Sequence, residues 1–118
     1  MTALDELFAG KEPVTREIYE RTVDAMRAVG AVGEDAKKTS VHLTAGDGGS
    51  AFAGAHPRRA GILLNLRTAA PIDSPRVRKL EQVSRNRFHN EILLARPDEV
   101  DEELAGWIRD AYAVARPA

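Results

Sequence analysis

The chain has 118 residues, of which 43% are apolar and 30% charged, a composition typical of one folded domain rather than a disordered segment. It contains no cysteine, which excludes disulfides, thiol nucleophiles and zinc-thiolate sites. The net charge is −1, yet residues 36–90 carry ten Lys or Arg against three Asp or Glu and lie between two segments of net charge −4. This basic middle segment favours an anionic ligand or partner, unless the acidic ends neutralise it within the fold. We predict a single domain over residues 1–118.

The first third of the chain is expected to be helical. A short amphipathic turn is predicted over residues 4–10. Pro13 then suits the first position of a longer helix, which Gly30 ends. The apolar side of this helix is formed by residues at helical spacing, namely Val14, Ile18, Thr22, Ala25, Met26 and Val29.

The middle of the chain changes to an alternating pattern that predicts strands. Residues 41–44 form the first expected strand, and Asp47-Gly48-Gly49 is a turn signal leading to a weaker strand over residues 51–56. Residues 57–61 are typical of a loop. The strongest expected strand is residues 62–67, with Ile62, Leu64 and Leu66 toward the core.

The last third is expected to alternate between helix and strand. Ser74 followed by Pro75 predicts a short basic helix through about Val83, and residues 88–95 return to strand character. Asp98 is the expected cap of a final amphipathic helix. The resulting order α-β-β-β-α-β-α predicts an α+β domain, with an antiparallel sheet of about four strands and helices packed on one face.

The sequence resembles a small bacterial family described as a domain of unknown function. This domain also occurs fused at the end of so-called predicted transport proteins. The residues that carry the resemblance are Lys38-Thr39-Ser40, Phe52, Pro57, Leu64, Leu66, His89 and the closing set Val100, Asp101, Glu103, Leu104, Trp107, Ala111 and Tyr112. In element order the chain is also similar to frataxin-like iron-chaperone domains. The resemblance implies one compact domain and no particular reaction.

Polar side chains gather on the side of the strands opposite the aliphatic core. The alternation places His42, Thr44, Asn65, Arg67, His89 and Glu91 there. A guanidinium gives forked contacts to an anion, and imidazoles exchange protons. We therefore predict a non-catalytic domain that binds an anionic small molecule or polyanion, rather than an enzyme. The predicted contacts are Lys38, His42, Arg58, Asn65, Arg67, Arg85, Arg87 and His89. The plain alternative is that these residues are only the solvated side of a sheet.

Three other functions stay open at this point. His42, His89 and Glu91 are proper metal ligands for a metal-handling protein or a small enzyme, although their spacing matches no metal motif. The arginine-rich run near Phe88 makes nucleic acid a weaker possibility, because no recognised binding motif is present. The third alternative is a homodimer formed through the sheet or the last helix.

No cofactor, metal or catalytic residue is assigned from the sequence. The glycine-rich stretch 46–50 lacks the lysine of a phosphate-binding loop. The first residues lack the pattern of an export signal, and no apolar run approaches the roughly 20 residues of a membrane-spanning helix. We expect a cytoplasmic protein without membrane contact.

Overall fold

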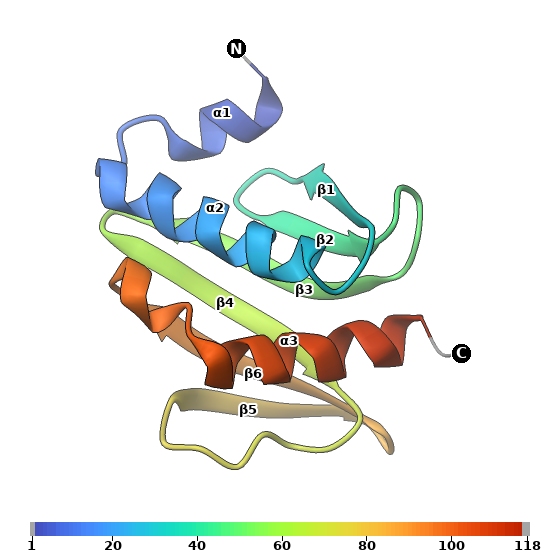
Figure 1. Cartoon of the computed structure of the whole chain (residues 1–118). Coiled ribbons are helices and arrows are strands. Elements are labelled where there is room, and N and C mark those ends of the chain that lie inside the picture. The colour runs from blue at the N-terminus through green and yellow to red at the C-terminus, as the bar shows by residue number, and fades with distance from the viewer. Residues whose placement is uncertain (1, 117–118) are drawn as a thin grey trace.

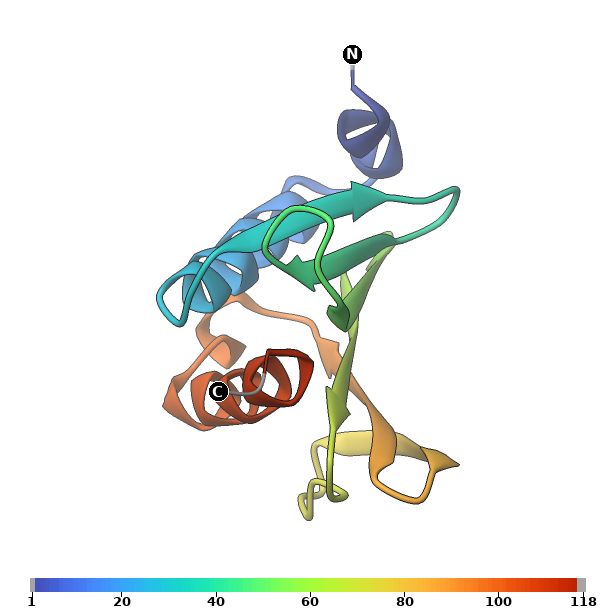
Figure 2. The same ribbon diagram turned by 90° about the vertical axis from the view of Figure 1, so that its right-hand side faces the viewer.

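A computed structural model describes residues 2–116 as one sheet with helices packed against it. The sheet is antiparallel throughout and has six strands in the order β1-β2-β3-β4-β6-β5. Helices α2 and α3 lie on the same face of this sheet, as Figures 1 and 2 show. The elements are α1 (Ala3–Phe8), α2 (Pro13–Arg27), β1 (Val32–Ala36), β2 (Val41–Ala45), β3 (Ala51–Arg58), β4 (Gly61–Thr68), β5 (Val77–Ser84), β6 (Arg87–Leu94), the 3-10 helix η1 (Pro97–Glu99) and α3 (Glu102–Ala115). Within these residues, no helix has both the length and the apolar character needed to cross a membrane.

The two N-terminal helices form where the sequence predicts them. Thr2 caps α1 by accepting a hydrogen bond at 3.0 Å from the backbone N–H of Asp5, and Pro13 occupies the first turn of α2. The rings of Phe8 and Tyr19 pack with their centroids 5.0 Å apart, which fixes α1 against α2.

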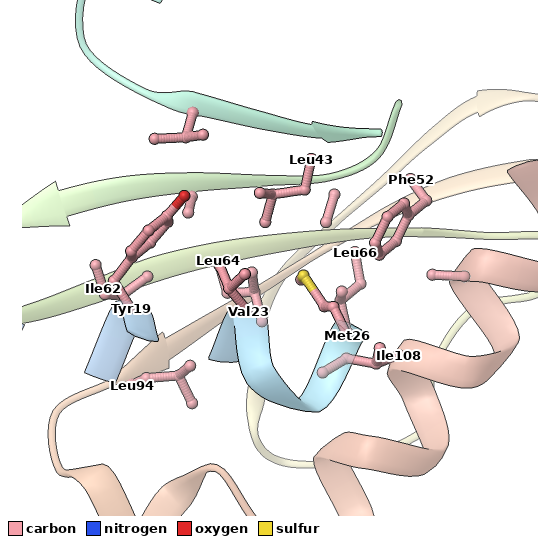
Figure 3. Packing of buried hydrophobic residues seen from close by; sticks show 14 of the residues in the cluster. Tyr19, Val23, Met26, Leu43, Phe52, Ile62, Leu64, Leu66, Leu94 and Ile108 are labelled. Atoms are coloured by element: carbon pink, nitrogen blue, oxygen red, sulfur yellow. The ribbon is translucent and has the colours of Figure 1, made fainter. Parts of the chain in front are cut away.

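The core lies between the sheet and the two long helices. Ile62, Leu64 and Leu66 alternate along β4 and are fully buried, which confirms their predicted orientation. Met26 of α2 and Ile108 of α3 pack over them from the helical layer (Figure 3). One face of the sheet is therefore committed to the core.

A β-bulge adds an aromatic side chain to this core. Leu43 pairs with Ala53 and Thr44 pairs with Ala51, so Phe52 is an extra residue on β3. The ring of Phe52 is fully buried and meets Tyr112 of α3 edge-on at 5.2 Å. The bulge thus turns Phe52 toward the helices.

The sheet has six strands rather than the expected four, and β1 is one of the two additions. Its sequence, Val-Gly-Glu-Asp-Ala, has no run of apolar residues, so no alternating pattern marks it. Pairing with β2 holds it instead, together with a hydrogen bond from the Tyr19 hydroxyl of α2 to the carboxylate of Glu34.

The second addition is β5, where the expected helix over residues 74–83 was wrong. Ser74 does not cap a helix; its hydroxyl accepts from the backbone N–H of Arg76 in a turn. Val77, Leu80 and Val83 have helical spacing, but Leu80 is 48% exposed and Val83 is 54% exposed. Their spacing does not mark a buried face, and the segment instead forms a hairpin with β6.

The last helix begins three residues later than predicted. Asp98 lies in the 3-10 helix, and Asp101 is the cap of α3, accepting a hydrogen bond at 3.0 Å from the backbone N–H of Leu104. Pro97 favours a separate turn before the helix.

Candidate functional site: the open sheet face around Arg67

The second face of the sheet, here called the open face, lies on the side away from α2 and α3 (Figure 2). Because successive side chains of a strand point to opposite faces, the buried residues of β4 and β6 identify which of their neighbours belong to the open face. The open face includes Asp35, His42, Thr44, Gly54, His56, Arg58, Leu63, Asn65, Arg67, Lys79, Glu81, Arg87, His89, Glu91 and Leu93. The predicted strand phases are thus confirmed for β2, β4 and β6.

Strand pairing arranges the polar residues of the open face in rows across the sheet. Arg67 on β4 lies directly opposite His89 on β6. In the next row, Asn65 lies opposite Gly54, which in turn lies opposite His42. Side chains one row apart on neighbouring strands remain within reach of one another, so this part of the sheet brings a guanidinium, an amide and two imidazoles together.

Arg67 is the central cation of this arrangement and has an unusual environment. Its side chain is half-buried, and Nε is covered by neighbouring atoms without a hydrogen-bond partner. Within residues 2–116 no carboxylate forms an ion pair with it. The side-chain oxygen Oδ1 of Asn65, two residues along the same strand, is also covered and unpaired. Buried polar atoms without partners are costly and uncommon, which makes this position the candidate site.

Arg76, by contrast, is an arginine whose guanidinium is fully paired within the fold. Its guanidinium contacts Asp101 at 3.0 Å and Glu103 at 3.1 Å, and donates to the backbone carbonyl of Glu99 at 2.8 Å. It also lies over the ring of Trp107, 5.5 Å from the centroid. The acidic last helix therefore neutralises Arg76, and it does not neutralise Arg67.

The two histidines nearest Arg67 are biased toward their neutral form. Partial burial lowers the pKa of His42, and the positive charges of Arg67 and Lys37 lower it further. Partial burial and the charge of Arg67 also lower the pKa of His89, although Glu81, 3.9 Å from its Nδ1, acts in the opposite direction. An anion placed at Arg67 would offset the charge that opposes protonation of both rings.

Gly54 is buried, yet it leaves a gap at the centre of the open face. A Cβ atom built at this glycine would meet nothing within 4 Å, so the space above β3 between His42 and Asn65 is open. Gly54 was not among the residues predicted for the site. A glycine in the interior of a strand is nevertheless a recognised signal of close approach by a ligand or another backbone.

The predicted contact residues fall into a centre and two ends. His42, Asn65, Arg67 and His89 form the centre. The remaining four lie at opposite ends of the sheet. Lys38 lies in the β1–β2 turn and Arg58 beside the β3–β4 turn at one end, and Arg85 and Arg87 lie at the β5–β6 turn at the other end. The length of β4, about 23 Å at roughly 3.3 Å per residue, separates these ends. One small ligand cannot contact all eight residues.

His56 was missed as a site residue and belongs to the open face. It is exposed on β3, diagonal to His42, and its charge also opposes protonation of His42. It lines a shallow hollow of about 400 Å³ with Thr39, Pro57, Arg58, Leu63 and Glu91. His42 lies on β2, whereas Gly54 and His56 lie on β3. That His56 lies close to His42 is therefore evident only once β2 and β3 are known to be neighbours.

The proposed metal ligands are not brought together. His42 lies on β2, whereas His89 and Glu91 lie on β6, with β3 and β4 between them. Three strand spacings of about 4.8 Å separate β2 from β6 by about 14 Å. Within the described residues, no three His, Cys, Asp or Glu side chains are placed to hold a metal ion together. Phe88, which lies beside the arginine-rich run, alternates to the helical side of β6 and is not part of the open face.

Comparison with known proteins identifies a family and supplies no reaction. The chain matches no curated protein and no solved structure. The similarity to frataxin-like domains and the fusion to transport proteins therefore stay predictions. The match to a family runs over residues 4–115, nearly the whole chain, and so includes every residue of the open face. The chain belongs to the family described as Domain of unknown function (DUF5655).

Proposed function

We propose that the chain is a non-catalytic binding domain whose open face receives a small anionic ligand at Arg67. The observation that carries the proposal is a half-buried arginine at the middle of an uncovered sheet face, without a carboxylate partner in the described chain and with an unpaired Nε. An arginine in such a place retains its full charge, because guanidinium does not lose its proton in proteins. A ligand carboxylate or phosphate would supply the missing counter-charge.

The neighbours of Arg67 complete a site for one anionic group. Gly54 provides space, His89 lies directly opposite Arg67 on the neighbouring strand, and His42 lies directly opposite Gly54. Asn65 contributes a carboxamide with an unused acceptor, which favours a ligand bearing a hydrogen-bond donor beside its charge, such as a hydrogen phosphate or a hydroxy acid.

A compact anion fits the arrangement better than a long polyanion. The central residues lie on neighbouring strands, whereas the basic pairs at the two ends of the sheet are about 23 Å apart. Open-face carboxylates also lie between the cations, with Glu91 3.6 Å from Arg78 and Glu81 beside His89. Alternating signs would oppose a continuous nucleic-acid track, because phosphate binding depends on accumulated positive charge.

Isothermal titration calorimetry with tripolyphosphate at low salt tests the proposal. We expect binding by the wild type and a loss of at least tenfold in affinity for Arg67→Gln, because hydrogen bonds to charged groups contribute about 1.5–3 kcal/mol. Arg21→Gln is the matched control. It removes the same charge from an exposed position on α2, where Arg21 faces Glu17 at 3.6 Å. Its affinity should stay within about twofold of the wild type.

Equal losses in Arg67→Gln and Arg21→Gln would show that only net charge matters, and would contradict a defined site. The double variant Arg85→Ala/Arg87→Ala locates the binding region independently. These arginines are exposed at the β5–β6 turn, so tripolyphosphate affinity should change by no more than about twofold. A tenfold loss there, accompanied by salt-dependent binding of a single-stranded oligonucleotide, would favour a nucleic-acid surface instead.

A further inference from the structure

Strand β5 forms one edge of the sheet and is exposed along almost its whole length. It pairs only with β6 among the described strands, and residues 78–84 are all exposed. Two of the three exposed large apolar side chains of the described chain, Leu80 and Val83, belong to this strand. A free strand edge offers unpaired backbone groups to another strand. In Figure 1 this edge is the lowest strand of the sheet.

The sequence of β5 is complementary to itself when two copies run antiparallel with Leu80 at the centre. In that register Leu80 faces Leu80 of the second copy. Lys79 faces Glu81, and by symmetry Glu81 faces Lys79, so two opposite-charge pairs form beside the central leucines. Next to them Arg78 faces Gln82, so no like charges face each other in this register.

Neighbouring registers lack this match. With Glu81 at the centre, two carboxylates would face each other directly. With Lys79 at the centre, two ammonium groups would face each other directly. Directly opposed like charges destabilise paired strands, so the sequence selects the register centred on Leu80.

Bulges limit the length of this pairing. The β5–β6 register shifts between Val77 and Lys79 and again between Gln82 and Ser84, which leaves Lys79–Gln82 as the regular stretch. Bulges near sheet edges restrict continued pairing. The contact is therefore short, and the two Lys79–Glu81 pairs make up a large share of it.

The opposite edge of the sheet does not have these properties. Antiparallel pairing of β1 about Glu34 would place two carboxylates against each other. The carboxylate of Glu34 is already bound by Tyr19 and by Arg27, the latter at 3.1 Å. Of the two edge strands, β5 is the one whose charges complement a second copy.

We propose that the protein forms a two-fold symmetric homodimer through β5, with Leu80 against Leu80 and Lys79 against Glu81. Directly opposed side chains of paired strands point to the same face, so the two-fold axis is perpendicular to the sheet. The two sheets continue as one, and both open faces lie on the same side. The dimer does not depend on ligand binding at Arg67.

A charge swap tests both the dimer and its register. Sedimentation equilibrium of the wild type should show a monomer–dimer equilibrium that weakens as salt rises. Lys79→Glu and Glu81→Lys should each weaken the dimer by at least about tenfold, because each change places like charges opposite each other twice. The double variant Lys79→Glu/Glu81→Lys restores opposite charges and should return to within about threefold of the wild type.

Arg109→Glu is the control for charge reversal, since Arg109 is exposed on α3 away from β5. It should dimerise like the wild type. Two results would overturn the proposal, namely a wild type that stays monomeric at millimolar concentration, or a double variant as weak as the single variants. Circular dichroism of every variant confirms folding, which exposed substitutions at these positions should preserve. Tripolyphosphate binding by Arg67→Gln tests the ligand site separately.

Discussion

Two arginines of the basic segment, Arg67 and Arg76, have contrasting surroundings. Arg76 has acidic and carbonyl partners on α3 and η1, and Arg67 has none within the described residues. The net charge of a segment therefore does not show which of its charged residues lack a partner of opposite charge in the fold. Only the placement of the acidic residues after folding decides which cations remain unpaired.

Replacing these two arginines should separate stability from binding. Arg76→Gln removes the contacts with Asp101 and Glu103, so the free energy of unfolding should fall by about 1 kcal/mol while tripolyphosphate affinity is retained. Arg67→Gln should leave the free energy of unfolding nearly unchanged and reduce affinity. Urea denaturation and calorimetry of the pair measure both effects, and a similar loss of stability in both variants would contradict the distinction.

Gly54 provides a test that keeps every charged residue in place. Gly54→Val adds a side chain where a Cβ meets no atom within 4 Å, so the fold should accept it. Valine suits a strand better than glycine, and the free energy of unfolding should stay equal or rise by up to about 1 kcal/mol. The added methyl groups should block the space between His42 and Asn65 and abolish tripolyphosphate binding. A stable variant with unchanged affinity would place the ligand elsewhere.

At the scale of elements, the alternating pattern predicted the core strands and the orientation of their side chains. Strands β2, β4 and β6 have one buried side, which leaves a periodic trace in the sequence. β5 is almost entirely exposed, so the spacing of its three apolar residues does not reflect a buried face. That spacing matches a helix and led to the wrong prediction. β1 is held by pairing and by Tyr19, which is distant in sequence.

The candidate site was predictable in part for the same reason. Strand phases placed His42, Arg67 and His89 on one face. Their proximity depends on the strand order, in which β6 lies between β4 and β5. The sequence does not show that order, and so the separation of the expected metal ligands and the contribution of His56 appeared only in the fold.

One hydroxyl joins α2 to the β3–β4 turn and predicts how these elements depend on each other. Thr15 is fully buried, and its Oγ1 donates toward the carbonyls of Arg58 at 3.0 Å and Arg59 at 3.1 Å and accepts from the N–H of Gly61 at 2.9 Å. Thr15→Val leaves these backbone groups without their partner, so the free energy of unfolding should fall by about 1–3 kcal/mol. Urea denaturation measures the change.

Thr15→Ser is the control for that prediction, because serine keeps the hydroxyl and loses only a methyl group. It should cost about 1 kcal/mol or less. A serine variant as unstable as the valine variant would show that packing, rather than hydrogen bonding, joins the turn to α2.

For the whole molecule, the histidines of the open face couple protonation to folding and, under the proposed function, to binding. The pKa values of His42 and His89 are lowered by folding, chiefly through partial burial and then through the charge of Arg67. Below the ordinary pKa near 6.5, the unfolded chain therefore binds more protons than the folded chain. The contribution of these histidines to the free energy of unfolding should decrease as pH falls from about 6.5 through their lowered pKa values.

Anion binding should show the opposite pH dependence. A bound anion at Arg67 favours the protonated histidines, so affinity for tripolyphosphate should rise several-fold between pH 8 and pH 5.5. Calorimetry at the two pH values measures the change. In the double variant His42→Gln/His89→Gln the rise should largely disappear. A rise of equal size in that variant would assign the effect to protonation of the probe or to groups outside the open face.

One NMR titration decides whether Arg67 is the centre of an anion site. The ring protons of His42, His56 and His89 report their pKa values without and with saturating tripolyphosphate. The proposed site predicts that the pKa values of His42 and His89 rise on binding and that amide shifts concentrate in β2, β3, β4 and β6. Unchanged histidine pKa values at saturation, or shifts concentrated in α2 and α3, would contradict it.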